Sequence, residues 1–364
     1  MKKLLAGLLA VALALSLLAC SSGYGGDSPT YTVTYVDGVE GLEITVPSDT
    51  NEYHEGDSVT VKFTGVGSRT GYTFTGWSDG TTSYTSSGTT TFTMGSANVT
   101  LTAQWRNIIK SRPDAVGDIV LNDGKAIAYA DFSAMTEAQK ASAIALIFYK
   151  GTGLNNGTDT TTSRVLGVGL KQNKTGLAWC LNTANAYNRQ LDQIQYVYSE
   201  GSQSFTTIGD KNGSGTFGKI SAFLSNLTDG TTDDTTTAGN YPAFEFAKQY
   251  KTVEGSRVSG TSFEEGWYLP SYAELTEIFT NGKGVNKVFD IDAALQALGG
   301  DKFEENPYLS SSTLTWIGNY GTDTGKSMVL FGDDWYGAPK DYTTLYDIGS
   351  GSNKPLCVCC IREF

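Results

Sequence analysis

The chain has 364 residues and a net charge of −12; glycines number 43, aromatic side chains make up 12% and charged side chains 18%. This length is enough for two ordinary domains, and the composition excludes a disordered chain, a coiled coil and a helical bundle. The acidic balance argues against nucleic acid as a partner, because phosphates would be repelled. A single histidine, His54, excludes zinc sites built from several histidines.

The N-terminus has the pattern of a secretory signal. Lys2 and Lys3 precede an apolar run over residues 4–19, which is too short to span a bilayer comfortably. The junction Leu17-Leu18-Ala19-Cys20 resembles the lipobox of bacterial lipoproteins, which implies cleavage before Cys20 and lipidation of that residue. The alternative is a plain signal peptide followed by a chance cysteine. We therefore expect a signal peptide over 1–19, a lipidated tether over 20–30, and a location in the cell envelope at the outer membrane or cell surface.

Residues 31–106 form the first predicted domain. Apolar and polar side chains alternate over residues 31–35, 42–46, 59–63 and 99–105, and turn-forming residues separate these runs. This period predicts strands with one face on a core. We expect the aromatic side chains of this region to belong to that core, namely Tyr72, Phe74, Trp77 and Trp105.

Three blocks of this domain resemble one copy of the internalin-type B-repeat, the Listeria–Bacteroides repeat of surface proteins. The blocks are Gly71–Trp77, Phe92–Met94 and Val99–Trp105, in that order. The resemblance implies a small β-grasp-like domain that serves as a spacer or adhesion module and carries no chemistry.

Residues 107–364 form the second predicted domain, in which strand and helix patterns mix. Strands are expected at 116–121, 145–149 and 164–170, and helices at 177–191, 217–227 and 244–250. Capping boxes at Thr136 and Ser271 predict two further helices, over 137–143 and 272–279. The loop 228–239, which contains Asp233 and Asp234, is polar and is expected to be solvated.

The end of the chain resembles the Legionella collagen-like C-terminal domain family. The matching residues, in chain order, are Trp267, Leu269, Pro270, Glu274, Leu275, Ser310, Ser311, Val358, Cys360, Ile361 and Arg362. Two positions depart from the family pattern, because Tyr268 and Cys359 stand where arginine is usual. The resemblance implies a C-type-lectin-like fold, so the whole chain is expected to be α+β. That fold serves lectins, formylglycine-generating enzymes and variable bacterial receptors, so it does not by itself identify a function.

The sequence favours a protein without a catalytic centre, metal or cofactor. Asp333 and Asp334 could offer oxygens to a cation, but neighbouring side chains on a strand point to opposite faces. For Cys359 and Cys360, only Arg362 is close enough in sequence to lower a thiol pKa. The alternatives that stay open are an enzyme on a formylglycine-generating scaffold, a hydrolase, and a purely structural envelope protein.

The stretch before the last strand has the composition of a recognition surface. Flat aromatic faces beside hydrogen-bonding side chains bind sugars and peptides. The candidate ligand-binding residues are Trp316, Tyr320, Asp333, Asp334, Trp335, Tyr336 and Tyr342. We therefore expect a non-enzymatic adhesion or ligand-recognition module for a glycan or protein, held at the membrane by its lipid anchor.

Four cysteines remain once Cys20 is lipidated. Cys359 and Cys360 are adjacent on the closing strand, so their side chains point to opposite faces and should not pair with each other. The resemblance to lectin-like folds implies a bridge from the first long helix to the last strand. This is Cys180–Cys360, with Cys180–Cys359 as the alternative.

Overall fold

The computed structural model describes residues 28–155, 159–187, 189–199, 204–207, 211–304, 308–318, 321–330, 346–347 and 356–364; in 196–199, 204–207, 314–318, 321–330 and 346–347 it describes the backbone alone. The chain divides into two compact units. The first comprises Met1–Gly67 and Thr75–Gln104, and the second comprises Ser68–Phe74 and Trp105–Phe364. Among the residues described, no helix is both long enough and apolar enough to cross a membrane.

The N-terminal part of the chain consists of short strands, as the alternating pattern predicts. They are β1 (Thr30–Tyr31), β2 (Val33–Val36), β3 (Tyr53–His54), β4 (Ser58–Thr60), β5 (Tyr72–Ser78), β6 (Ser83–Tyr84), β7 (Thr91–Thr93) and β8 (Val99–Asn107). A four-stranded sheet has the order β2-β8-β5-β6, with β2 and β8 parallel. Two further two-stranded sheets are formed by β1 with β3 and by β4 with β7. Trp77 is fully buried, as expected; its ring meets Tyr35 edge-to-face at 4.7 Å and its indole N–H donates to the Lys62 carbonyl at 2.8 Å. Tyr72, Phe74 and Trp105 are only partly buried.

The strand expected at residues 42–46 does not form. The Asp37 carboxylate accepts the backbone N–H of Val39 at 3.1 Å and that of Ile44 at 3.0 Å, which folds this segment into a loop. The alternation puts Leu42 and Ile44 on one face, yet Ile44 is 9% exposed whereas Leu42 is 48% exposed. The pattern therefore predicted neither the backbone conformation nor the burial of Leu42.

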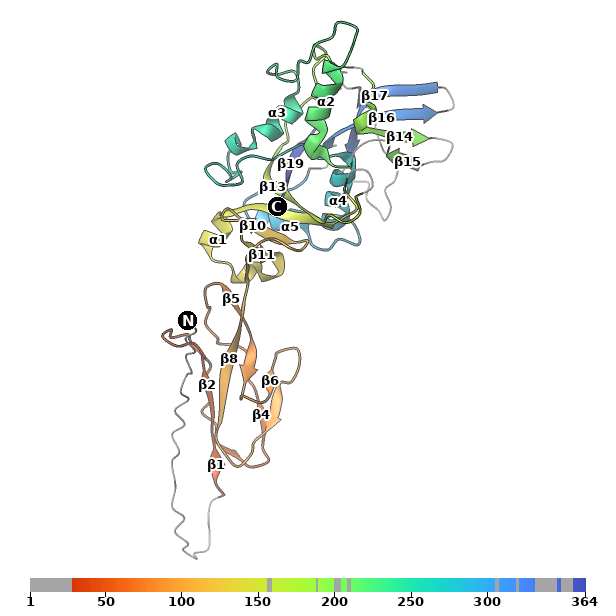
Figure 1. The fold of residues 1–364 in the computed structure, drawn as a ribbon. Helices are drawn as coiled ribbons and strands as arrows, with labels where there is room; N and C mark the ends of the chain where they lie inside the picture. The colour runs from red at the N-terminus through yellow and green to blue at the C-terminus, as the bar shows by residue number, and fades with distance from the viewer. Residues whose placement is uncertain are drawn as a thin grey trace, which may run out of the picture. The chain divides into compact units, whose positions relative to one another are not determined.

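The second unit is built around a six-stranded antiparallel sheet of order β19-β13-β12-β10-β11-β9 (Figure 1). Its strands are β9 (Ile109–Lys110), β10 (Asp118–Leu121), β11 (Ala126–Ala128), β12 (Ala143–Gly151), β13 (Arg164–Asn173) and β19 (Val358–Glu363). A five-stranded sheet of order β15-β14-β16-β17-β18 lies beside it; its strands are β14 (Gln195–Ser199), β15 (Ser204–Thr207), β16 (Tyr308–Gly318), β17 (Gly321–Leu330) and β18 (Tyr346–Asp347). The two sheets are joined where the Leu309 N–H donates to the Cys357 carbonyl at 3.0 Å.

Helices cover both faces of the six-stranded sheet. Within the described residues they are α1 (Glu137–Ala141), α2 (Thr216–Ser225), α3 (Pro242–Lys248), α4 (Tyr272–Gly282) and α5 (Ile291–Ala297). Short 3-10 turns are η1 (Tyr129–Ala134), η2 (Asp192–Ile194), η3 (Gly213–Gly215) and η4 (Tyr250–Thr252). One core cluster contains buried side chains of α4 and α5, and the other contains those of α2 and α3. The second unit therefore mixes helix and sheet, and the chain as a whole is α+β and rich in strands.

Local signals predicted most helices, and one prediction was wrong. The capping boxes at Thr136 and Ser271 are both present, and α1 and α4 begin directly after them. The helix expected over residues 177–191 does not form. The N–H of Leu177 donates instead to the Leu356 carbonyl at 3.1 Å and that of Leu181 to the Asn240 carbonyl at 2.9 Å. These bonds to distant segments replace the local bonds that a helix would need.

Cys359 and Cys360 point to opposite faces of the last strand, as predicted, and the described cysteines form no disulfide bridge. Cys359 belongs to one core cluster and Cys360 to the other, so their side chains point to opposite faces. Cys180 shares the cluster of Cys360, yet Cys180, Cys357, Cys359 and Cys360 are all buried thiols, so neither of the expected bridges is formed. Cys180 and Cys360 thus lie in one core cluster without a covalent bond between them.

Gly169 offers a test of this packing. A methyl group at this position would overlap the Tyr250 side chain, which is fully buried and whose hydroxyl oxygen accepts the backbone N–H of Lys171 in β13 at 2.8 Å. We expect Gly169→Ala to lower the free energy of unfolding by about 1–3 kcal/mol through overpacking. The matched control is Gly218→Ala in α2, where a methyl group meets nothing within 4 Å and helix propensity predicts a gain of up to about 1 kcal/mol. Denaturant unfolding measures both, and equal effects would contradict the packing at Gly169.

Candidate functional site

Most of the predicted ligand-binding residues lie outside the residues that the structure describes. Trp316 lies in β16, for which only the backbone is described at that position. The others lie outside the described residues, and they are Tyr320, Asp333, Asp334, Trp335, Tyr336 and Tyr342. The candidate site is therefore built from the described side chains around the same five-stranded sheet.

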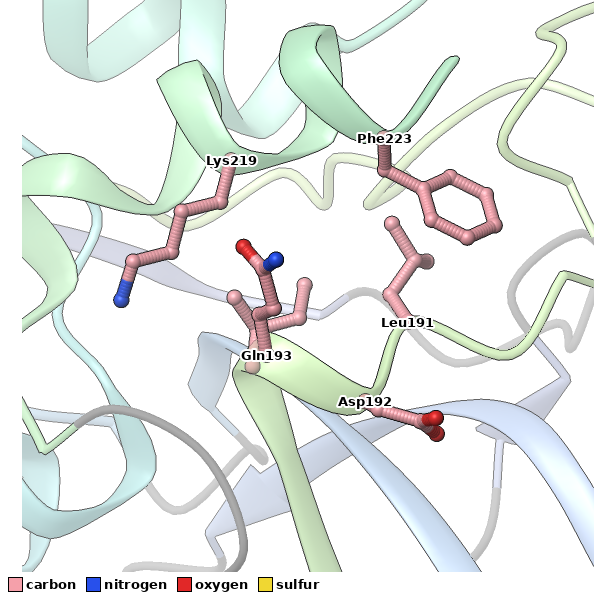
Figure 2. A pocket seen from close by; sticks show the side chains of 6 residues that line it. Leu191, Asp192, Gln193, Lys219 and Phe223 are labelled. Carbon is pink, nitrogen blue, oxygen red and sulfur yellow. The ribbon is translucent and has the colours of Figure 1, made fainter. Parts of the chain in front are cut away.

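A pocket of about 170 Å³ opens between η2 and α2 (Figure 2). The described residues that line it are Leu191, Asp192, Gln193, Ile194, Lys219 and Phe223. The chain continues from η2 directly into β14, which runs parallel to β16 with Gln195 opposite Thr313. The pocket thus lies at the beginning of the strand that neighbours the Trp316 strand.

The core fixes the two elements that form the pocket. Ile220 and Leu224 of α2 are fully buried, and this orients the adjacent side of the helix, one residue earlier in each turn, toward the pocket. Lys219 and Phe223 are four positions apart, so they share one helix face. On the other wall, Leu191 is 3% exposed and Ile194 is 1% exposed, which anchors η2 at both ends.

The polar groups of the pocket have distinct directions. Figure 2 shows the Gln193 amide between the Lys219 side chain and the Leu191–Phe223 pair, whereas the Asp192 carboxylate is turned away from the Lys219 amine. Asp192 accepts a hydrogen bond from the Gln190 side-chain amide at 2.6 Å. Removal of water around Lys219 lowers the pKa of its amine below the usual value. The pocket thus combines an apolar wall with an amide and a partly desolvated ammonium group.

A second polar cluster, around Arg164, is buried at its centre, while its member Glu363 is half-exposed. The side chain of Arg164 is 3% exposed and that of Glu274 is not exposed at all, and their charged groups meet at 3.0 Å. The guanidinium also donates to Glu363 at 3.0 Å, to the Tyr268 hydroxyl at 2.9 Å and to the Leu154 carbonyl at 2.7 Å. This Arg164 cluster joins β13, β19 and the start of α4, so its role is to hold the fold together.

The Arg164 cluster also includes Tyr268. The Tyr268 hydroxyl donates to Glu274 at 2.9 Å and accepts from Arg164. Backbone N–H groups of Gly213 and Ser271 donate to the other Glu274 oxygen, at 3.0 and 2.8 Å. Burial raises the pKa of the Glu274 carboxyl, and the charge of Arg164 opposes that rise.

The aspartates of the loop 228–239 are structural, which corrects the expectation of a solvated loop. Asp234 accepts the Tyr241 hydroxyl at 2.7 Å, the Asn185 backbone N–H at 2.8 Å and the Asn240 side-chain amide at 2.8 Å. Asp233 accepts the Thr235 hydroxyl at 2.8 Å. Within the described part of the chain, no group of three or more His, Cys, Asp or Glu side chains is placed to hold a metal ion.

The environment of the thiols does not favour their action as nucleophiles. Burial raises the pKa of Cys180 to about 12 and raises those of Cys359 and Cys360 above their usual value. A thiol needs a lowered pKa to act as a nucleophile near neutral pH. The arrangement of these cysteines therefore disfavours the nucleophile that a formylglycine-generating scaffold would use.

Sequence reasoning missed the pocket for an identifiable reason. The sequence did predict one wall, because a helix over 217–227 places Lys219 and Phe223 on the same face. The wrong helix over 177–191 ended at Leu191 and hid the 3-10 turn that forms the other wall. Only long-range pairing brings the two walls together.

Residues 31–109 match the family described as the divergent InlB B-repeat domain. This supports the resemblance of the N-terminal part of the chain to B-repeats of surface proteins. No curated protein and no solved structure matches the chain.

Proposed function

We propose that the chain is a lipid-anchored cell-envelope protein whose second unit is a non-enzymatic binding module for a glycan or a protein. The B-repeat in front of it acts as a spacer between the membrane and this module. The observation that carries the proposal is the pocket between η2 and α2, with its apolar wall of Leu191 and Phe223 beside the Gln193 amide and the Lys219 amine. Mixed walls of this kind are typical of sites that bind small groups.

The state of the other polar groups supports binding rather than catalysis. The Arg164 cluster and the Asp233–Asp234 loop are occupied with internal hydrogen bonds, and the buried thiols have raised pKa values. Nothing in this described set resembles a nucleophile beside a base. We propose a β-grasp-like fold for the repeat and a C-type-lectin-like fold for the second unit, where the closing strand β19 beside β13 and the capped helix α4 fit the expected order.

An array of glycans and host proteins, probed with the full chain, tests the binding function. We expect a specific ligand whose affinity falls at least about tenfold in Phe223→Ala, as for an aromatic side chain at the centre of a contact. The matched control is Leu181→Ala, which removes an apolar side chain that is 41% exposed and does not line the pocket. An array with no ligand would favour the structural alternative, and a ligand lost equally in both variants would place the site elsewhere.

The lipid anchor has its own test. We expect Cys20→Ala to shift the protein from the membrane fraction to the soluble fraction, because the lipobox would no longer supply an acylated cysteine. Detergent-phase partitioning of cells that express either form measures the shift, and Cys180→Ala, at a buried position of the second unit, is the control. A Cys20→Ala protein that still enters the detergent phase would refute the anchor.

A further inference from the structure

Arg362 lies near the end of β19 and is held by two aromatic rings. Its guanidinium carbon lies 5.2 Å from the centre of the Phe263 ring and 5.8 Å from that of the Phe364 ring. The two ring centres are 5.6 Å apart, and both rings pack against the core cluster that contains Trp267. We call the side chains of Arg362, Phe263 and Phe364 the Arg362 patch. Because the core fixes the rings and the rings attract the cation, the guanidinium is held in place at a partly exposed position.

The acidic side chains nearest in the chain to the patch residues already pair with other cations. Glu363 pairs with Arg164 at 3.0 Å. Two acids that follow Phe263 both pair with Lys251, namely Glu264 at 3.8 Å and Glu265. In the part of the chain that the structure describes, no carboxylate therefore forms an ion pair with Arg362.

The hydrogen-bonding groups of Arg362 are likewise unmatched. Its Nε atom is buried and has no hydrogen-bond partner among the described residues. Its Nη1 atom lies close above Gly266, where a methyl group would approach it to 2.6 Å, and Gly266 is exposed. Removal of water lowers the pKa of the Arg362 guanidinium below its usual value. The protein thus withdraws this cation partly from water without supplying a balancing charge, and an anionic ligand would offset that cost.

The surroundings of the guanidinium favour one kind of anion. A guanidinium presents parallel N–H groups that match a carboxylate in one plane. The chain has a net charge of −12, which repels polyanions more than it repels a single carboxylate. The rings of Phe263 and Phe364 offer a surface to methylene groups but no hydrogen bonds, which suits an acidic side chain better than a sugar rich in hydroxyl groups. Arginine and aromatic side chains are also enriched at the hot spots of protein–protein interfaces.

We infer that the Arg362 patch binds the carboxylate of a glutamate or aspartate side chain on a protein partner. The terminal Nη groups of Arg362 donate to the carboxylate, and the methylene groups of the acidic side chain pack against Phe263 and Phe364. The patch shares no residue with the pocket between η2 and α2, so it is a second site and does not depend on the function proposed for that pocket.

A nuclear magnetic resonance titration of the full chain with two capped tripeptides tests the inference. One peptide has glutamate between two glycines, and the other has the neutral isostere glutamine in its place. The backbone N–H signals of Phe263 and Phe364 report binding in every variant. We expect the glutamate peptide to bind about tenfold more tightly than the glutamine peptide, the difference that a charge-assisted bidentate hydrogen bond supplies. Arg362→Met is expected to abolish this difference, whereas Arg112→Met, at an exposed arginine outside the patch, keeps it.

Arg362→Lys protects the test against a loss of folding in the methionine variant. It keeps the positive charge and the long aliphatic stem, but a lysine ammonium has no planar fork and does not stack on the rings as a guanidinium does. We therefore expect Arg362→Lys to reduce the preference for glutamate to less than about threefold. Circular dichroism spectra that match the native chain establish that each variant compared is folded.

The outcomes separate this inference from the proposed function. Equal binding of the two peptides, binding of neither, or a preference that persists in the folded Arg362 variants would overturn the inference. A response to glucuronate at lower concentration than to the glutamate peptide would make the ligand an acidic sugar and overturn it likewise. An array ligand that depends on Phe223 would still support the pocket in each of these cases. Conversely, a glutamate preference that Arg362→Met removes supports the second site even if the array yields no ligand for the pocket.

Discussion

Replacement of Arg164 by methionine is expected to lower the free energy of unfolding of the second unit by about 3–5 kcal/mol, because it leaves the Glu274 carboxylate buried without its partner. The two charged groups meet at 3.0 Å and their side chains are 3% and 0% exposed. Methionine retains much of the volume of arginine, so a cavity contributes little. The exposed pair Lys125–Asp123 supplies the control, and Lys125→Met is expected to cost less than about 1 kcal/mol.

The loss of unfolding free energy in Arg164→Met should become smaller as the pH falls. Burial raises the pKa of Glu274 in the folded chain, and the charge of Arg164 opposes the rise, so the pKa rises further in the variant. A raised folded-state pKa means that the folded chain takes up a proton before the unfolded chain does, so stability is gained as pH falls. The deficit of Arg164→Met relative to the native chain should therefore shrink as the pH is lowered from about 8 to about 5. Chemical denaturation at several pH values measures it, and a small, pH-independent deficit would contradict the buried pair.

Trp77→Ala is expected to unfold the first unit while it leaves the second unit folded. Trp77 is fully buried against Tyr35 and donates to the Lys62 carbonyl, and truncation of such a side chain costs about 3–5 kcal/mol. That is a large share of the total stability of a unit this small. Leu42→Ala, at a side chain that is 48% exposed, is the control and should change little.

Hydrogen exchange with mass spectrometry reports on the two units separately. In Trp77→Ala we expect fast exchange in β2, β5 and β8 and native protection in β12 and β13. Loss of protection throughout the chain would show that the two units do not fold independently and would contradict the division at about residue 105.

Local features were predictable from the sequence because their causes are local. Thr136 and Ser271 each begin a helix through bonds to residues three positions away, and α1 and α4 follow. Alternation located the strands β2, β4 and β8 for the same reason. The irregular segment that includes Leu177 and Leu181 was missed, since its backbone bonds reach Leu356 and Asn240.

The contacts of buried polar groups were still harder to predict, because they join residues that are far apart in the sequence. Arg164 and Glu363 are 199 positions apart, and no pattern near Arg164 indicates that it would meet Glu274 in a closed cluster. Tyr268 and Glu274 both contact the Arg164 side chain, although the sequence around them indicates neither contact. The pocket likewise depends on the approach of η2 to α2, which only the tertiary structure defines.

The most direct test of the binding module is a titration of the ligand from the array into the native chain and the Phe223→Ala and Leu181→Ala variants by isothermal calorimetry. Circular dichroism first establishes that the three proteins are equally folded. We predict that the Kd rises at least about tenfold for Phe223→Ala and is unchanged for Leu181→Ala. A Kd that is the same in all three proteins would contradict the assignment of binding to the pocket between η2 and α2.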